Sequence, residues 1–240
     1  MTDPLHQFVI SPIVKINIGG IDLSFTNSSL SVIVAFLLTS VFLSLGLRKG
    51  KIIPGRMQAA VEMIYTLVTD LIDSNIGKKG IRYFPFVFSV FMFILLGNLV
   101  GMIPRMFTFT SHIIVTFSLA MVVFIFVTIL GIVLHGLKFF TLFAPAGLPK
   151  FLLPVLVPIE LISYLSRPIS LSVRLFANMM AGHTMMKVFA GFTAAIGFLG
   201  FLPIAVNVVL TGFEIFIAVL QAYIFTILTC VYLNDAVNLH

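Results

Sequence analysis

The stretch ELISYLSRPISLSVRLFANMMAGH, residues 160–183, decides how this chain folds, because it sets charged side chains into a long hydrophobic run. Glu160, Arg167 and Arg174 are seven residues apart, and a helix advances about 100° per residue, so the three share one face. Three smaller polar residues fall within about 40° of the same line. They are Ser163, Ser170 and Asn178. His183 points to the opposite side of the helix.

Arg174 stands at the centre of this polar face. Placing an arginine in a lipid bilayer costs at least about 2.5–3.5 kcal/mol on insertion scales, and guanidinium cannot escape the cost by losing its proton. So costly a side chain indicates a function rather than a packing role.

The composition predicts an all-α integral membrane protein. The 240 residues are 60% hydrophobic and 9% charged, with a mean hydropathy of +1.19, whereas soluble domains carry about 25% charged residues. The net charge of +6 does not indicate nucleic-acid binding, because the basic residues cluster at the ends of hydrophobic segments. The single Cys230 excludes a disulfide framework, and no GxxxxGK[ST] phosphate loop occurs.

The hydrophobic segments predict five membrane-embedded helices in one membrane domain, 1–240. They cover residues 29–47, 84–103, 112–137, 154–190 and 203–235. The last two would be about 51–55 Å long, against a hydrocarbon core of about 30 Å. We therefore expect a hairpin of two long helices that are strongly tilted or broken, with Pro168 permitting a kink.

Two segments are not predicted to cross. Residues 55–73 form one amphipathic helix at the membrane interface, with an apolar stripe that lipid headgroups or a partner helix could cover. Residues 1–27 read as an irregular or short amphipathic arm. The connection between the first two spans holds seven of the fourteen basic residues, so it is predicted to be cytoplasmic. The N-terminus would then lie outside and the C-terminus in the cytoplasm.

A second polar ladder follows in the last segment. Asn207, Glu214, Gln221 and Asp235 fall on one seven-residue series. In an antiparallel hairpin the two ladders would meet at three levels, with Glu160 opposite Asp235, Arg174 opposite Gln221, and His183 opposite Glu214. Asn98, between two glycines of an earlier span, is either a helix-packing hydrogen bond or a channel group.

These three levels suit proton transfer through water. Carboxyl oxygens stand on the inner side and an imidazole–carboxylate pair on the outer side. The fixed charge of Arg174 between them blocks a continuous relay. The two half-paths conduct only if a mobile carboxylate carries the proton around by another route, releasing it when it faces the cation.

The motifs LSRPISLSVRLFANMMAGH and EIFIAVLQAYIFTILTCVYLNDAVNLH resemble subunit a of the rotary F-type ATP synthases, and the resemblance covers nearly the whole chain. It implies a membrane stator whose essential arginine, Arg174, faces the carboxylate of a c-subunit ring. It also implies an outer half-channel of Asn178, His183, Glu214 and Gln221, and an inner one of Glu160 and Asp235. Asn98, Ser163, Arg167, Ser170 and Asn207 are further candidates.

The same resemblance implies partners and a location. The partners would be the c-ring, b-type subunits of the peripheral stalk, the remaining ATP synthase subunits and membrane lipid, with no nucleotide, nucleic acid, cofactor or metal. The transported ion would be H⁺. Histidine at 183 with glutamate at 214 resembles the mitochondrial version and its bacterial relatives, which indicates the inner (plasma) membrane of an alphaproteobacterium. A mitochondrial inner membrane is the alternative.

A secondary transporter with an ion site at mid-membrane is the alternative function. Such transporters usually show interrupted helices in two related halves, whereas the polar ladders here occupy only the C-terminal third. A purely structural subunit would need no paired ionisable groups at several depths.

Overall fold

The computed structural model describes residues 9–15, 17–18, 21–22, 24–48, 52–103, 106–136, 138–139, 153–195 and 200–238. These residues form six α-helices: α1 (Asn27–Leu47), α2 (Arg56–Ile76), α3 (Phe84–Gly101), α4 (Ile113–His135), α5 (Leu153–Ala195) and α6 (Phe201–Val237). Two short 3-10 helices, η2 (Lys78–Tyr83) and η3 (Phe109–Ser111), precede α3 and α4. The described part is therefore all-α apart from its N-terminal arm. The largest difference from a predicted boundary is at the end of α5, which continues to Ala195 instead of residue 190.

Four stretches of the described chain are long and apolar enough to cross a membrane. They are α1, η2 with α3, α4 and α6. The fifth predicted span, α5, is not among them, because it carries the charged ladder Glu160, Arg167 and Arg174. Its place in the membrane is taken up below as a proposal.

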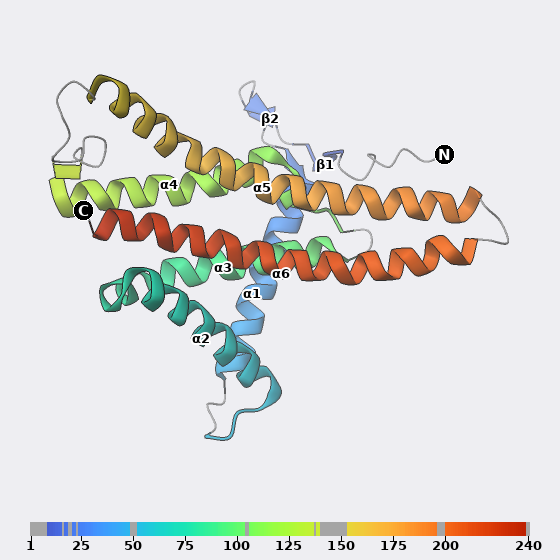
Figure 1. Ribbon diagram of the computed structural model, residues 1–240. Helices are drawn as coiled ribbons and strands as arrows, with labels where there is room; N and C mark the ends of the chain where they lie inside the picture. The colour runs from blue at the N-terminus through green and yellow to red at the C-terminus, as the bar shows by residue number, and fades with distance from the viewer. Residues whose placement is uncertain are drawn as a thin grey trace.

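Helices α5 and α6 are single, unusually long helices of 43 and 37 residues. Pro158 and Pro168 lie inside α5 and each removes one helix hydrogen bond, yet the helix continues through both. Figure 1 shows α5 changing direction along its length before it runs beside α6. At 1.5 Å per residue the two helices are about 65 and 55 Å long, roughly twice the bilayer core.

The long helices lie in a layer with α3 and α4. Helix α5 packs on α6 and on α4, while α6 also packs on α3. Figure 1 shows α1 running across the direction that these four helices share. A helix that is hydrophobic on all sides belongs in a protein interior, and α3 fits this rule, since Val87, Met92 and Ile94 are almost fully buried between its neighbours.

The apolar stripe of α2 is covered by other helices of the same chain. Val68 and Ile72 are fully buried in the core cluster that includes Leu233 of α6, while Met57 at the start of α2 is 47% exposed. The sequence analysis considered lipid headgroups or a partner helix as the cover. The structure supports a helix rather than lipid as the cover, because most of the stripe packs against α1 and α6, which belong to the same chain.

Where the structure describes it, the N-terminal arm consists of four short strands and irregular residues, and the strands were not predicted. Strand β1 (Pro12–Val14) pairs antiparallel with β4 (Phe25–Thr26), and β2 (Asn17–Ile18) pairs with β3 (Ile21–Asp22). Strands of two or three residues are too short to show the alternation that identifies a strand in a sequence. The Oγ of Thr26 then accepts a hydrogen bond from the backbone N–H of Ser29 and caps α1.

Candidate functional site

Arg174 lies on an exposed face of α5. Ser163, Ser170 and Asn178 are exposed with it, while Glu160 and Arg167 are half-buried. Among the residues that the structure describes, Arg174 makes no hydrogen bond and no ion pair. Directly behind it, Leu171 and Leu175 are buried in the core cluster. The helix therefore presents the arginine away from the body of the chain.

His183 and Glu214 meet where α5 packs on α6. The His183 Nε2 lies 3.5 Å from the Glu214 Oε1, and only 7% and 4% of the two side chains are exposed. The predicted contact between these residues is confirmed. Gly182 makes room for it, since a Cβ at that position would lie 2.7 Å from the Glu214 Oε1.

A third side chain, Thr108, joins this pair from the connection between α3 and α4. Its Oγ1 lies 3.1 Å from the His183 Nε2 and donates a hydrogen bond to the Gly101 carbonyl at 3.2 Å. The sequence analysis did not identify Thr108. It lies 75 residues from His183 in a short connection with no helical period, so no pattern in the sequence places it beside the pair.

The middle level pairs Asn178 with Gln221. The Asn178 Nδ2 donates to the Gln221 Oε1 at 2.9 Å, and Gln221 is 1% exposed. The prediction of Gln221 opposite Arg174 is corrected, because Arg174 points outward whereas Gln221 is buried beneath α5.

Asn98 joins α3 to α6 near the same level. Its Nδ2 donates to the Ala218 carbonyl at 3.3 Å, which is the helix-packing hydrogen bond that the sequence allowed. Its Oδ1 and the Gln221 Nε2 are buried without a partner among the described residues. A buried acceptor and a buried donor of this kind are suitable sites for internal water.

The inner level is an ion pair rather than the predicted pair of carboxyl groups. Arg167 Nη1 donates to Asp235 Oδ2 at 2.8 Å, with 24% and 31% of the two side chains exposed. The guanidinium also lies 5.2 Å from the ring centre of Tyr164 and 5.0 Å from that of Tyr232. Opposite charges attract while two carboxylates repel, so Asp235 pairs with Arg167. Glu160 has no hydrogen bond or ion pair within the described residues.

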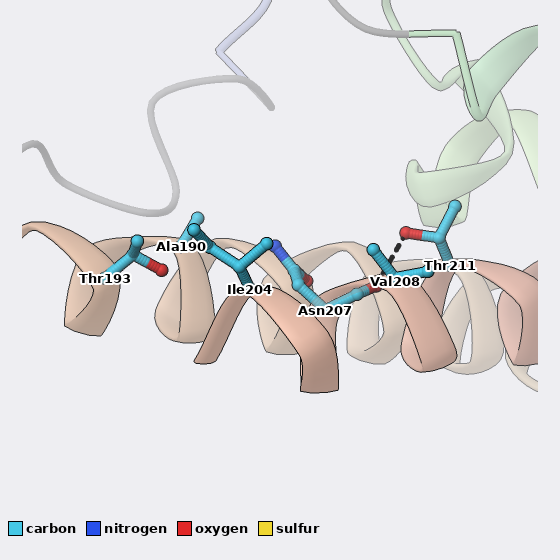
Figure 2. A pocket seen from close by; sticks show the side chains of 6 residues that line it. All are labelled: Ala190, Thr193, Ile204, Asn207, Val208 and Thr211. Atoms are coloured by element: carbon cyan, nitrogen blue, oxygen red, sulfur yellow. Dashed lines mark hydrogen bonds between the residues drawn. The ribbon is translucent and has the colours of Figure 1, made fainter. Parts of the chain in front are cut away.

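A shallow, open cleft of about 350 Å³ lies between the ends of α5 and α6 that are joined by the hairpin turn (Figure 2). It is lined by Ala190, Thr193, Ile204, Asn207, Val208 and Thr211. Thr211 Oγ1 donates to the Asn207 carbonyl at 2.8 Å, and the buried Asn207 Oδ1 has no partner in the described part of the chain. Asn207 is one heptad from Glu214, so the cleft offers a polar opening toward the His183 pair.

The described polar groups of the hairpin do not gather into a single cluster. Within the described residues, no three His, Cys, Asp or Glu side chains gather in one place. Polar and ionisable groups instead follow the α5–α6 contact at several levels. Arg174 lies exposed beside that contact, and no described residue pairs with its charge.

Comparisons with known proteins agree on one family. Residues 29–234 match the family model described as ATP synthase A chain. A protein of Parvibaculum lavamentivorans called ATP synthase subunit a is 54% identical over 98% of this chain and 94% of its own length. Proteins of the same name from Rhodospirillum rubrum and Pelagibacter ubique are 53% and 54% identical over the whole of this chain, covering 100% and 99% of their own lengths.

Proposed function

Because the chain belongs to the ATP synthase A chain family, we propose that its polar residues form two half-channels for protons, offset on either side of Arg174. A member of this family is a non-catalytic subunit of an F-type ATP synthase. The chain is accordingly a proton-translocating stator subunit in the bacterial plasma membrane. Because the chain belongs to this family, the alternative function of a secondary transporter is rejected.

The outer half-channel begins at the cleft beside Asn207 and leads to His183 and Glu214. From there it continues along Asn178 and Gln221, with the two unpartnered buried atoms at Gln221 and Asn98 providing places for water. Carboxylate and imidazole groups relay a proton through intervening water, and the amide groups hold that water by hydrogen bonds. The close approach of His183 to Glu214 is the observation that carries this proposal.

The inner half-channel runs along the other end of the hairpin. Glu160 is its titratable group, because it is half-buried and free of any ion pair among the described residues. Asp235 lines this half-channel with Arg167 as its cation, so it contributes an oriented carboxylate rather than an isolated acid. The exposed hydroxyls of Ser163 and Ser170 extend the polar face toward Arg174.

Arg174 separates the two half-channels and faces a partner. An exposed guanidinium at bilayer depth requires an anionic group from another subunit, and the carboxylates of a rotating c-ring supply it. The face of α5 that carries Arg174 also carries Met185 and Val188, which are apolar and exposed, and this suits contact with a hydrophobic ring. Other faces would contact b-type stalk subunits and lipid. The proposal invokes no cofactor, since the transported ion is the proton.

The direction of α1 indicates how the molecule lies in the membrane. If α1 crosses along the membrane normal, the layer of α3 to α6 is strongly tilted, since α1 runs across it (Figure 1). Such a tilt lets α5 lie in the membrane as the fifth embedded helix. It also explains how hairpin helices longer than the bilayer core is thick can fit within it. The basic connection between α1 and α3 faces the cytoplasm, which puts the N-terminus outside and the C-terminus in the cytoplasm.

An exchange of His183 and Glu214 tests the proposal. His183→Glu and Glu214→His each leave one ionisable group without its complement in a poorly solvated place, so each should slow proton uptake from the outer side. The double exchange restores one acid and one imidazole and should recover part of the rate. The measurement is ATP synthesis driven by an imposed proton gradient in membrane vesicles, with assembly followed by blotting. A double variant no better than the product of the two single effects would contradict a shared outer site.

A further inference from the structure

We propose that Thr108 is a positioning residue of the outer half-channel: it holds the His183 imidazole with its hydrogen on Nε2, which leaves Nδ1 to take up the incoming proton. The inference rests on the proposed role of His183. It adds a residue from outside the α5–α6 hairpin to the site.

The hydrogen-bond donors and acceptors around Thr108 determine which imidazole nitrogen carries hydrogen. A hydroxyl has one hydrogen to donate and lone pairs that accept. The Gly101 carbonyl only accepts, and it receives the Thr108 hydrogen at 3.2 Å. The Thr108 oxygen then faces the His183 Nε2 at 3.1 Å with lone pairs alone. With the hydroxyl hydrogen on the Gly101 carbonyl, Thr108 can only accept from Nε2, and the proposal accordingly assigns the hydrogen of the neutral ring to Nε2.

Thr108 is held firmly enough to impose this choice. It is 5% exposed, and its own carbonyl accepts hydrogen bonds from the backbone N–H of Ser111 at 3.1 Å and from the Ser111 Oγ at 2.6 Å. A Cβ on Gly101 would lie 2.6 Å from the Thr108 Cγ2, so the glycine permits the close approach. The position of the hydroxyl is set by the α3–α4 connection and not by the hairpin.

The same nitrogen also faces the carboxylate of the pair. His183 Nε2 lies 3.5 Å from Glu214 Oε1 while it contacts Thr108. With the hydrogen on Nε2, the ring donates to Thr108 and turns the same N–H edge toward the Glu214 carboxylate, which attracts it. Its only remaining lone pair is on Nδ1, which is where an incoming proton binds. Without Thr108, one of the two groups that hold the hydrogen on Nε2 is lost.

Activity in the assembled enzyme gives the first test. Thr108→Val keeps the shape of the side chain and removes the hydroxyl, so ATP synthesis driven by an imposed proton gradient should fall roughly three- to tenfold, the range that one net hydrogen bond covers. Thr108→Ser keeps the hydroxyl and should stay within about twofold of the wild type. The matched control is Thr116→Val, because Thr116 is equally buried but its hydroxyl bonds only carbonyls at the start of its own helix.

A spectroscopic readout separates positioning from mere support of the fold. Nitrogen-15 magnetic resonance of histidine-labelled enzyme in lipid distinguishes the two imidazole tautomers, and the His183 signal is the one lost in His183→Gln. Wild type and Thr108→Ser should show hydrogen on Nε2, and Thr108→Val a mixture. A wild-type signal with hydrogen on Nδ1, or an unchanged Thr108→Val signal, would overturn the inference.

Failure of the inference differs from failure of the proposed function. If His183→Gln impairs synthesis while Thr108→Val behaves as Thr116→Val does, the role of Thr108 is refuted and the outer half-channel stands. If His183→Gln synthesises ATP at the wild-type rate, the proposed half-channel itself is wrong, and the inference fails with it.

Discussion

The described polar side chains of the hairpin differ in whether they have hydrogen-bond partners. This difference distinguishes side chains that only pack from those proposed to take part in transport. Thr226 and Thr229 are fully buried, but their hydroxyls bond carbonyls of their own helix, so they need no partner. Glu214 is equally buried, yet its oxygens have no hydrogen bond in the described part of the chain. A buried carboxyl group left in that state is costly unless water or a moving proton reaches it. The proposed outer half-channel therefore centres on Glu214 and its neighbour His183.

Gly182→Ala should disturb this pair without changing either residue. The new Cβ would lie 2.7 Å from the Glu214 Oε1, so the carboxylate must move away from the imidazole. We expect proton-driven ATP synthesis to fall by roughly the three- to tenfold that one weakened hydrogen bond or ion pair covers.

Gly191→Ala is the matched control for that change. It lies on the same helix, and no heavy atom within 4 Å would meet its Cβ. Both variants gain the same helix propensity, roughly 1 kcal/mol, so that gain cancels in the comparison. Equal rates for the two variants, with both subunits assembled, would show that the space beside Gly182 has no role in transport.

At this scale the sequence predicts some residues and cannot predict others. The antiparallel pairing of the two hairpin helices places His183 and Glu214 at one level, and they are in contact. Thr108 could not be found, because a contact across 75 residues from a short connection leaves no periodic signal. The sequence indicates only that placing Arg174 in the bilayer costs free energy. It does not predict that Arg174 is exposed, because a sequence does not say which face of a helix another helix covers.

The two long helices form a unit whose ends are fixed by different interactions. At the inner end, Arg167 binds Asp235 and lies against the rings of Tyr164 and Tyr232. Tyr164 in turn shares a hydrogen bond of 2.7 Å with Thr128 of α4. This cluster ties α5 to α6 and to α4, so it fixes the register of the face that carries Arg174.

The predicted partners across the hairpin were about one turn in error at the middle level, where Gln221 meets Asn178, and about two turns at the inner level, where Asp235 meets Arg167. The predicted pairing across the hairpin assumes that both helices are straight and that their side chains are short. Helix α5 contains Pro158 and Pro168 and changes direction, and the Arg167 side chain is long enough to reach Asp235 in place of the predicted Glu160. Periodicity gives the face of a residue on a helix, but the angle between two helices decides which residues on those faces meet.

The ion pair at the inner end predicts a non-additive pair of variants. Arg167→Gln should lower the amount of assembled subunit and the rate of ATP-driven proton pumping, because it leaves the Asp235 carboxylate half-buried without its cation. Asp235→Asn alone should have a similar effect, by leaving the guanidinium unpaired.

The variant with both changes should perform better than Arg167→Gln, since no unpaired charge remains. Immunoblots of membranes give the amount of subunit, and quenching of a pH dye in inverted vesicles gives the pumping rate. Single effects that simply add in the double variant would show that the two side chains do not stabilise each other.

In the whole molecule, the remaining helices serve to hold the hairpin. The core cluster joins α2, α3, α4, α5 and α6, with Ile72, Ile94, Val123, Leu175 and Phe225 as examples from each. Hydrophobic runs predicted these helices well, because the membrane requires apolar length above all. They did not predict that α2 packs on its own chain, since an apolar stripe reads the same whatever covers it.

The arrangement gives the membrane sector its asymmetry. Paired and buried polar groups lie inside the layer of α3 to α6, and the unpaired charge of Arg174 lies on its surface. Two half-channels that meet at such a charge transmit protons only through a partner that turns past it. The central claim is therefore that coupling depends on the guanidinium of Arg174.

Proton movement in membrane vesicles carrying Arg174→Ala or Arg174→Lys tests this claim most directly. Assembly should be preserved, because Arg174 has no partner among the described residues. We predict that Arg174→Ala abolishes both ATP-driven pumping and proton-driven synthesis, and that Arg174→Lys is severely impaired, since an ammonium differs in reach and can lose its proton when desolvated. Near-normal coupled ATP synthesis in assembled Arg174→Ala enzyme would contradict the account.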